Sequence, residues 1–207
     1  MDNHDIKNLL IDFGSVLVNL DHDRCAANFR RLGLEDMGPL LDTERPDSLL
    51  PRYEKGLVSS AEFRDAIRQQ IGKKVTDRQI DTAWNSFLTD LPKQRLDLLM
   101  RLRKRYVVYL LSNTNEIHWQ WACDHLFTYR TFTEEDYFEK SYLSFQMGMM
   151  KPDTDIFKAV MLDAGITAGE TFFIDDSPLN CQAAQSLGMA TYTPMPGEDW
   201  SHLFYDD

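Results

Sequence analysis

The sequence lacks long hydrophobic runs and contains few cysteines. No stretch of 18 uncharged apolar residues occurs, so we expect no transmembrane span and no membrane partner. The first five residues, MDNHD, are acidic and do not lead into the apolar segment of a secretory signal. An odd, dispersed set of cysteines is typical of a reducing compartment and argues against a disulfide framework or a zinc site: Cys25, Cys123 and Cys181. These absences predict a cytoplasmic protein.

Basic residues are also fewer than acidic residues. The chain has 22 Lys and Arg against 33 Asp and Glu, a net charge of −11, which disfavours nucleic acid as a partner. The one basic cluster, residues 101–105, follows an apolar helical pattern, where cations favour a helix C-terminus. An anionic substrate would therefore need local cations or a metal. With 207 residues, 43% of them hydrophobic, the chain can build a substantial core.

Short apolar runs predict the buried strands of a parallel sheet at residues 8–11, 107–111, 171–174 and 190–192. Helical patterns alternate with them, beginning near Pro92, Glu116, Pro152 and Pro178. Residues 127–145, which are rich in aromatic side chains, are interpreted as hydrophobic packing around the sheet. The alternation predicts an α/β fold: a Rossmann-like parallel sheet with helices on both faces.

Residues 21–89 show no strand pattern. Two capping boxes, Ser59 with Glu62 and Thr76 with Gln79, each precede an amphipathic run. We therefore predict an all-helical insertion at 20–89, within an α/β core formed by 1–19 and 90–207.

Each of the three main strands is followed by polar residues, and such residues meet at the carboxyl edge of a parallel sheet. Asp12, after the first strand, is either a structural or capping carboxylate or a nucleophile or metal ligand. Asp175 and Asp176 are costly side by side unless a cation neutralises them, although an N-cap with a solvated neighbour is the simpler alternative. Together the three acids suit a hard cation such as Mg²⁺.

Two further segments carry polar groups that suit a phosphate. Ser112 and Asn113 offer a hydroxyl, an amide and backbone N–H groups, although they also suit an N-cap for the helix beginning at Glu116. Lys151 would ordinarily be a solvated surface residue. The turn fixed by Pro152 can instead direct it into the cleft.

The order Asp12, Ser112-Asn113, Lys151-Pro152, Asp175-Asp176 resembles the haloacid dehalogenase (HAD) superfamily, and the resemblance covers essentially the whole chain. The helical insertion resembles that family's helical cap. The stretches YEKGLVSSAEFRDAI, AWNSFLTDLPKQRLDLLMRL, YLLSNTN and FIDDSPLN are most similar to the bacterial sugar-phosphatase branch, which includes glucose-1-phosphatase-like enzymes.

The resemblance implies a Mg²⁺-dependent phosphatase that hydrolyses a small phosphorylated metabolite, with sugar phosphates among the candidates. Asp12 would attack phosphorus and form an aspartyl-phosphate. The metal ligands would be Asp12, the Gly14 carbonyl and Asp176, with Asp175 orienting waters or Lys151. The phosphate-binding groups would be Ser112, Asn113 and Lys151, the last with a catalytic role as well.

Gly14 departs from the pattern of most phosphatases in this superfamily, which have at this position a second aspartate that transfers protons. The resembling branch often has glycine here too. An acid could instead come from the start of the cap, at Asp21, His22 or Asp23, or the substrate could have an acidic leaving group, or turnover could be slow or absent. General acid–base catalysis typically contributes about 10²–10⁴-fold, so this departure matters.

Two alternatives to the phosphatase remain open: a non-catalytic phospho-ligand-binding or regulatory protein, and a metal-free 2-haloacid dehalogenase, against which the acidic pair argues. Substrate selection is expected in the cap, with possible contacts from His22, Trp84, Asn85 and the loop 53–56. The particular substrate, the resting cap position and the choice between a monomer and a small homo-oligomer are not encoded in any motif that we recognise.

Overall fold

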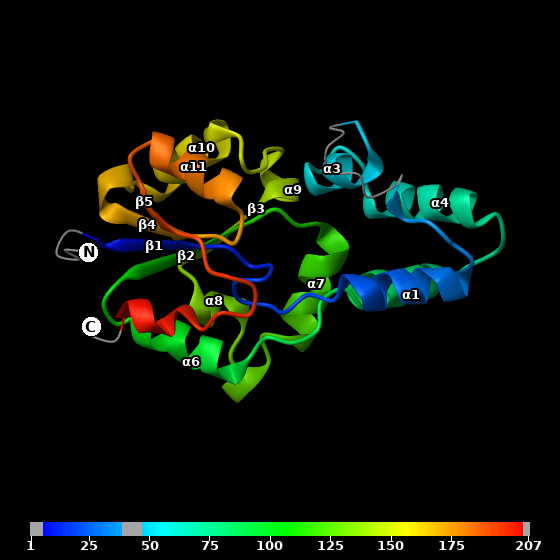
Figure 1. Cartoon of the computed structure of the whole chain (residues 1–207), viewed down its shortest axis with the longest axis horizontal. Helices are drawn as coiled ribbons and strands as arrows, with labels where there is room; N and C mark the ends of the chain where they lie inside the picture. The colour runs from blue at the N-terminus through cyan, green and yellow to red at the C-terminus, as the bar shows by residue number, and fades with distance from the viewer. Residues whose placement is uncertain (1–5, 39–46, 205–207) are drawn as a thin grey trace.

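The structure is a computed structural model that describes residues 6–38 and 47–204. Its centre is a five-stranded parallel sheet with the strand order β3-β2-β1-β4-β5 (Figure 1). The strands are β1 (Asn8–Ile11), β2 (Val107–Ser112), β3 (Lys140–Leu143), β4 (Thr171–Ile174) and β5 (Ala190–Tyr192). The α/β class is therefore confirmed, and so are all four strands expected from apolar runs.

The register of the central strands decides where the polar residues meet. β1 lies between β2 and β4, and Ile11 is opposite both Leu110 and Ile174. β1 and β4 end level with each other and β2 runs two residues further in the same direction, so the side chains that follow the three strands lie at one edge of the sheet. Asp12 continues the pairing, since its backbone N–H donates to the carbonyl oxygen of Ile174 at 2.9 Å.

The strand β3 has no counterpart among the predicted strands, since we interpreted residues 127–145 only as packing. Its sequence, KSYL, is half polar, and its burial rises from exposed Lys140 to buried Leu143. It lies at the edge of the sheet, where only one neighbour, β2, pairs with it. A short edge strand does not need the continuous apolar run that marks a central one.

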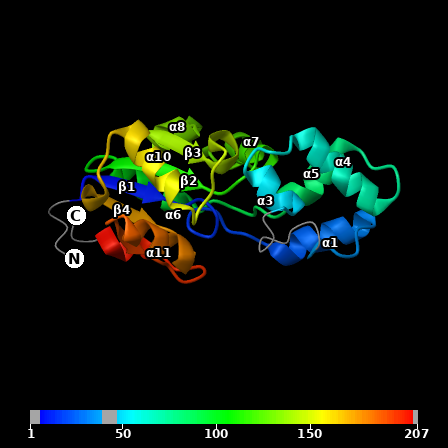
Figure 2. The ribbon, with the colours of Figure 1, turned by 90° about the horizontal axis from the view of Figure 1, so that it is seen from above.

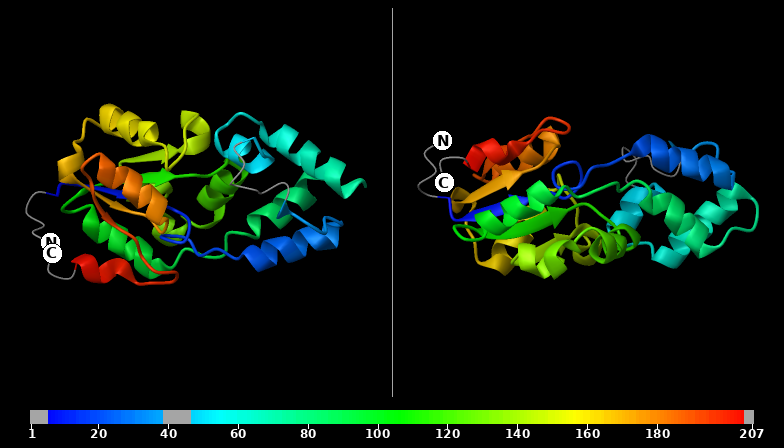
Figure 3. Two further views of the ribbon diagram at one scale, coloured as in Figure 1. Left: turned by 45° about the horizontal axis from the view of Figure 1, so that its top comes forward. Right: turned by 90° about the horizontal axis from the view of Figure 1, so that it is seen from below.

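Helices cover both faces of the sheet, as predicted (Figures 1 and 3). Alternation along β1 sends Leu9 and Ile11 to one face and Leu10 to the other. The first face packs against α6 (Lys93–Leu102), α7 (Glu116–His125), α8 (Glu134–Tyr137) and η4 (Trp200–Phe204). The second face packs against α10 (Thr154–Ala164) and α11 (Pro178–Ser186). Short elements complete the core: η2 (Tyr129–Thr131), α9 (Ser144–Met147) and η3 (Ala168–Glu170).

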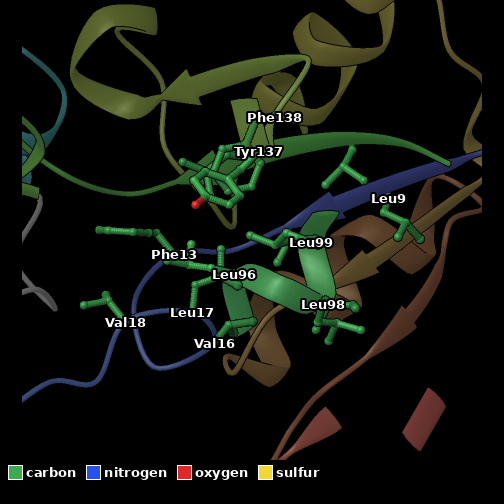
Figure 4. Close-up of a cluster of buried hydrophobic side chains, with 14 of the residues drawn as sticks. Leu9, Phe13, Val16, Leu17, Val18, Leu96, Leu98, Leu99, Tyr137 and Phe138 are labelled. Atoms are coloured by element: carbon green, nitrogen blue, oxygen red, sulfur yellow. The ribbon is translucent and has the colours of Figure 1, made fainter. Parts of the chain in front are cut away.

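The loop after β1 is anchored in the larger of these clusters (Figure 4). Phe13, Val16, Leu17 and Val18 are all buried there, close to Leu96 of α6. The carbonyl oxygen of Phe13 accepts the backbone N–H groups of Leu17 and Val18, both at 2.9 Å. The residue that precedes this anchored loop, Asp12, is therefore held in a fixed position.

Among residues 12–38 and 47–92, four helices are described, and they form a body beside the carboxyl edge of the sheet (Figure 2). They are α1 (His22–Leu32), α3 (Leu49–Glu54), α4 (Ser60–Ile71) and α5 (Asp77–Asn85). Both predicted capping boxes are present, at the starts of α4 and α5. These helices bury a cluster of their own, which includes Phe29, Phe63 and Trp84.

The two connections between this body and the core run antiparallel and are joined by backbone hydrogen bonds. The N–H of Thr89 donates to the carbonyl of Asn19 at 2.9 Å, and that of Asn19 donates to Asp90 at 2.8 Å. The predicted division at 20–89 falls at this crossing, but as a domain boundary it stays a prediction. Within residues 6–38 and 47–204, no helix combines the length and apolar character that crossing a lipid bilayer requires.

Candidate active site

A buried lysine lies between two buried carboxylates at the carboxyl edge of the sheet. Lys151 Nζ is 2.6 Å from Asp12 Oδ1, 2.6 Å from Asp175 Oδ2 and 2.9 Å from the carbonyl oxygen of Leu111. Lys151 is only 3% exposed. All three donors of the ammonium group are therefore used, which is how a buried charge is retained. Of the two interpretations of Lys151, the structure supports the one in which it points into the cleft.

Hydrogen bonds from neighbouring residues hold both Lys151 and Asp175 in place. The Asn113 amide donates to the carbonyl oxygen of Lys151 at 2.8 Å and accepts its backbone N–H at 2.9 Å. Asp175 accepts from the Ser177 backbone N–H at 2.8 Å and from Asn180 Nδ2 at 2.9 and 3.1 Å. With Lys151 as a further donor, the Asp175 carboxylate is well supplied with hydrogen bonds. It is therefore suited to positioning Lys151.

The electrostatics of the site favour a further cation. Burial raises the pKa of Asp12 from its usual 3.8 to about 7, an effect that Lys151 opposes and Asp175 reinforces. Burial also raises the pKa of Asp176, and Asp175 adds to that effect. Oxygen atoms of Asp12, Asp175 and Asp176 lie within 4.8 Å of one another. One lysine does not neutralise three carboxylates, so this donor set fits a hard divalent cation.

Gly14 lies two residues after Asp12, and its carbonyl oxygen accepts the N–H of Val16 at 2.6 Å. A carbonyl oxygen has a second lone pair, so this contact leaves it able to bind a metal. A Cβ added at Gly14 would meet only the tip of Leu20, at 3.4 Å. Packing therefore does not require glycine at this position.

Ser112 is buried at the end of β2, and its hydroxyl makes only a long contact, 3.4 Å, to the carbonyl of Asn113. The alternative in which Ser112 and Asn113 cap the following helix is wrong. The N-cap of α7 is Asn115, whose side chain accepts the His118 N–H at 3.1 Å. The Ser112 hydroxyl therefore remains available for a ligand.

A cavity of about 530 Å³ lies between the carboxyl edge of the sheet and the helical body. Gly14, Ser112 and Asn113 line its inner end, and mostly apolar side chains of the helical body line the rest. Of the predicted cap contacts, His22 and Trp84 line this cavity. Asn85 does not: it lines a separate cavity with Arg24 and Arg78.

Trp84 is a core residue of the helical body and also lines the cavity. Its ring stacks on His118 with centroids 4.4 Å apart, and its Nε1–H donates to Asn115 Oδ1 at 3.2 Å. His118 Nε2 donates to the carbonyl oxygen of Trp84 at 3.1 Å, and Nδ1 accepts from Asn115 Nδ2 at 3.2 Å. Burial lowers the pKa of His118 to about 4, against the opposing effect of its hydrogen bond to Trp84.

Glu54, the last residue of α3, also lines the cavity. Burial raises the pKa of its carboxyl from 4.5 to about 7, an effect that Lys151 opposes and Asp12 reinforces. The sequence patterns placed Glu54 only within a loop expected to select substrates. No motif marks it as an acid, because the contact depends on how α3 lies against the sheet edge.

Comparison with known proteins agrees with this fold. The profile of the haloacid dehalogenase-like hydrolase family matches residues 6–188, so the chain belongs to that family. The resemblance inferred from its motifs is thereby confirmed.

Three relatives illustrate the similarity. A D-ribitol-5-phosphate phosphatase from Bacteroides thetaiotaomicron is 37% identical over 195 residues, covering 94% of this chain and 95% of the relative. A crystal structure of a HAD family enzyme from Bacteroides thetaiotaomicron, the wild-type protein in complex with magnesium and inorganic phosphate, is 60% identical, covers 96% of this chain and 99% of its own, and has a TM-score of 0.93. A predicted HAD-like family hydrolase from Porphyromonas gingivalis is 35% identical over 98% of this chain and 100% of its own, with a TM-score of 0.89.

Proposed function

We propose that this protein is a Mg²⁺-dependent phosphatase that hydrolyses the phosphate ester of a small sugar or sugar alcohol, with D-ribitol 5-phosphate as the first candidate. The observation that carries the proposal is the placement of Asp12 at the end of β1, fixed by Lys151 and followed directly by Phe13 and Gly14, which line a cavity. The relative at 37% identity supports the substrate class, because it is a D-ribitol-5-phosphate phosphatase.

The residues that would hold Mg²⁺ are Asp12, Asp176 and the carbonyl oxygen of Gly14. When bound, the metal ion neutralises the carboxylates so that an anionic phosphate can approach Asp12. The similar enzyme crystallised with magnesium and inorganic phosphate supports Mg²⁺ as the metal. Asp175, which accepts hydrogen bonds from Lys151, Ser177 and Asn180, would act by orienting Lys151.

The chain's own residues account for the transfer step. Asp12 Oδ attacks phosphorus in line, and an aspartyl-phosphate forms as the ester oxygen leaves. The Ser112 hydroxyl, the Asn113 backbone N–H and Lys151 stabilise the equatorial phosphate oxygens. Water then hydrolyses the aspartyl-phosphate and regenerates Asp12. The apolar walls of the cavity exclude bulk water from these steps.

The two alternative functions fit the site less well. A dehalogenase that works without metal has no use for three carboxylates within 4.8 Å of one another. A non-catalytic binding protein has no need of a buried carboxylate held by Lys151 beside the residues that line the cavity.

The remaining proposals concern context. We place the protein in the cytoplasm, which agrees with three unpaired cysteines. Its partner is the small phosphorylated metabolite rather than nucleic acid or a membrane, and we expect a monomer or a small homo-oligomer.

The test is a panel of sugar and sugar alcohol phosphates, with p-nitrophenyl phosphate as a generic substrate, assayed with Mg²⁺ or EDTA. We expect hydrolysis that requires Mg²⁺ and falls by at least about 10³-fold in Asp12→Asn. If the wild type hydrolyses nothing but binds these phosphates, the binding protein is favoured. Chloride release from 2-chloropropionate in EDTA would favour the dehalogenase.

A further inference from the structure

Gly14 leaves the proposed phosphatase without a proton-transfer group beside Asp12. We propose that Glu54 of the helical body is the catalytic acid and base, donating a proton to the leaving oxygen and later accepting one from the attacking water. This inference rests on the proposed function, because it assigns the proton path of that reaction.

The first argument is position. Glu54 lines the same cavity as Gly14, Ser112 and Asn113. Gly14, Ser112 and Asn113 lie at the same strand ends as Asp12, so the leaving group of a substrate on Asp12 is expected to extend into this cavity. Glu54 therefore faces the leaving group from the cap, whereas the family's usual aspartate would face it from position 14.

The second argument is that the chain on both sides of Glu54 is anchored. Tyr53 is buried, and its hydroxyl lies 2.8 Å from Ser60 Oγ and accepts the Ile117 backbone N–H, from α7, at 3.3 Å. Gly56 has a φ of +68° and approaches the carbonyl oxygen of Phe145 so closely that an added Cβ would lie 2.2 Å from it. The contacts of Tyr53 with Ile117 and of Gly56 with Phe145 cross from the helical body to the core, so they hold the end of α3 against the site.

The third argument is the protonation state. Because burial raises the pKa of Glu54 to about 7, the carboxyl can carry a proton near neutral pH and can also release it. The ionisable groups that line the cavity with it are His22, Asp23 and Cys25 from α1 and His118 from α7, and the charges of Lys151 and Asp12 in the core also act on it.

The acids expected at the start of the cap are less suitable. Asp21 is the N-cap of α1 and accepts the Arg24 backbone N–H at 2.8 Å. The ring of His22 packs edge-on against Phe87, with centroids 4.7 Å apart. Asp23 lines the cavity but is solvent-exposed, so no described neighbour fixes its side chain toward the sheet edge.

The proton balance closes over the two steps. As the Asp12 oxygen bonds to phosphorus and the ester bond breaks, the Glu54 proton passes to the leaving oxygen and gives the free alcohol. As water attacks the aspartyl-phosphate, its proton passes to the Glu54 carboxylate. Inorganic phosphate and the Asp12 carboxylate are released, and Glu54 is again protonated.

The test compares Glu54→Gln with the wild type on p-nitrophenyl phosphate, whose leaving group needs no proton. We expect a burst of about one equivalent of p-nitrophenol, an acid-quenched protein heavier by one phosphoryl group, and steady-state turnover lowered about 10²–10⁴-fold. With an alkyl phosphate we expect no burst, because the first step then needs the acid. Glu54→Ala should be partly rescued by added formate.

Glu35→Gln, an exposed carboxylate of the same helical body, is the matched control and should behave as the wild type. Wild-type turnover in Glu54→Gln with both substrates would overturn the assignment. A phosphoenzyme burst in Asp23→Asn or His22→Ala, with none in Glu54→Gln, would also overturn it. Failure of formate to rescue a folded Glu54→Ala would also count against it. If the wild type itself hydrolyses no phosphate ester, the proposed function and this inference both fail.

Discussion

Lys151 Nζ donates to Asp12 Oδ1 at 2.6 Å, and both side chains are buried. The same ammonium group contacts Asp175 at 2.6 Å, so one cation holds two carboxylates in place. Burial opposes the charge on Lys151, but Asp12 and Asp175 outweigh that effect and raise its pKa above the usual value. The proposed nucleophile therefore depends on Lys151 both for position and for charge.

We predict that Lys151→Met lowers the free energy of unfolding by about 3–5 kcal/mol without metal, because it leaves two buried carboxylates without their cation. Mg²⁺ should restore part of this loss, since it supplies positive charge at the same carboxylates. Urea denaturation with EDTA or Mg²⁺ measures both effects. Lys158→Met is the control: Lys158 forms only an exposed pair with Asp155, so it should change stability by about 1 kcal/mol or less.

The pH dependence of stability should carry a contribution from His118. Its pKa is about 4 in the folded protein and 6.5 when unperturbed, so between these values the unfolded chain binds a proton that the folded chain does not. Stability from this group is therefore lost as the pH falls from about 6.5 to about 4. The loss amounts to about 3 kcal/mol, at 1.36 kcal/mol per pKa unit.

Protonation of His118 cannot be accommodated by rotating Asn115, because Asn115 Oδ1 already accepts from Trp84 Nε1 and the His118 backbone N–H. We predict that His118→Gln loses stability at pH 7 but declines less than the wild type between pH 6.5 and 4. Comparing the two unfolding curves cancels the opposite contributions of Asp12 and Glu54, whose raised pKa values favour the folded state at low pH. Parallel pH profiles would contradict the role given to His118.

The sequence predicted the central strands and the acids that follow them because each signal is local. Asp12 and Asp175 follow continuous apolar runs, and such runs predict buried parallel strands whose ends meet. The edge strand β3 was missed because KSYL has a polar half. The N-cap at Asn115 was also missed, since any of several polar residues before Glu116 could have served.

Residues whose role depends on tertiary placement could not be predicted in the same way. Asn85 and Trp84 are neighbours on α5, yet only Trp84 faces the central cavity. Glu54 lies 42 positions after Asp12 along the chain, and its environment depends on the contacts of Tyr53 and Gly56 with the core. No spacing rule relates the end of a cap helix to the end of a strand.

The close approach of Gly56 to Phe145 predicts that a substitution at position 56 lowers turnover, although it changes no carboxylate. Gly56→Ala would place a Cβ 2.2 Å from the Phe145 carbonyl oxygen, so the end of α3 must shift and carry Glu54 with it. We expect turnover to fall at least about 10-fold, since small displacements of catalytic groups are costly. Gly72→Ala is the matched control: its φ is +70°, but nothing lies within 4 Å of the added Cβ. Equal turnover in the two variants would contradict the anchoring role of Gly56.

The last prediction concerns Gly14→Asp, which places an acid at the position where most phosphatases of this superfamily have one. A Cβ added there meets the tip of Leu20 at 3.4 Å, an ordinary contact, so we expect Gly14→Asp to fold. Combined with Glu54→Gln, it should recover at least about 10-fold of the lost turnover of an alkyl phosphate, because the new carboxyl lies on the other wall of the same cavity. Gly14→Asn with Glu54→Gln has the same shape but cannot transfer the proton, and it should recover nothing. If both double variants recover equally, the gain comes from packing or hydrogen bonding at position 14 rather than from proton transfer.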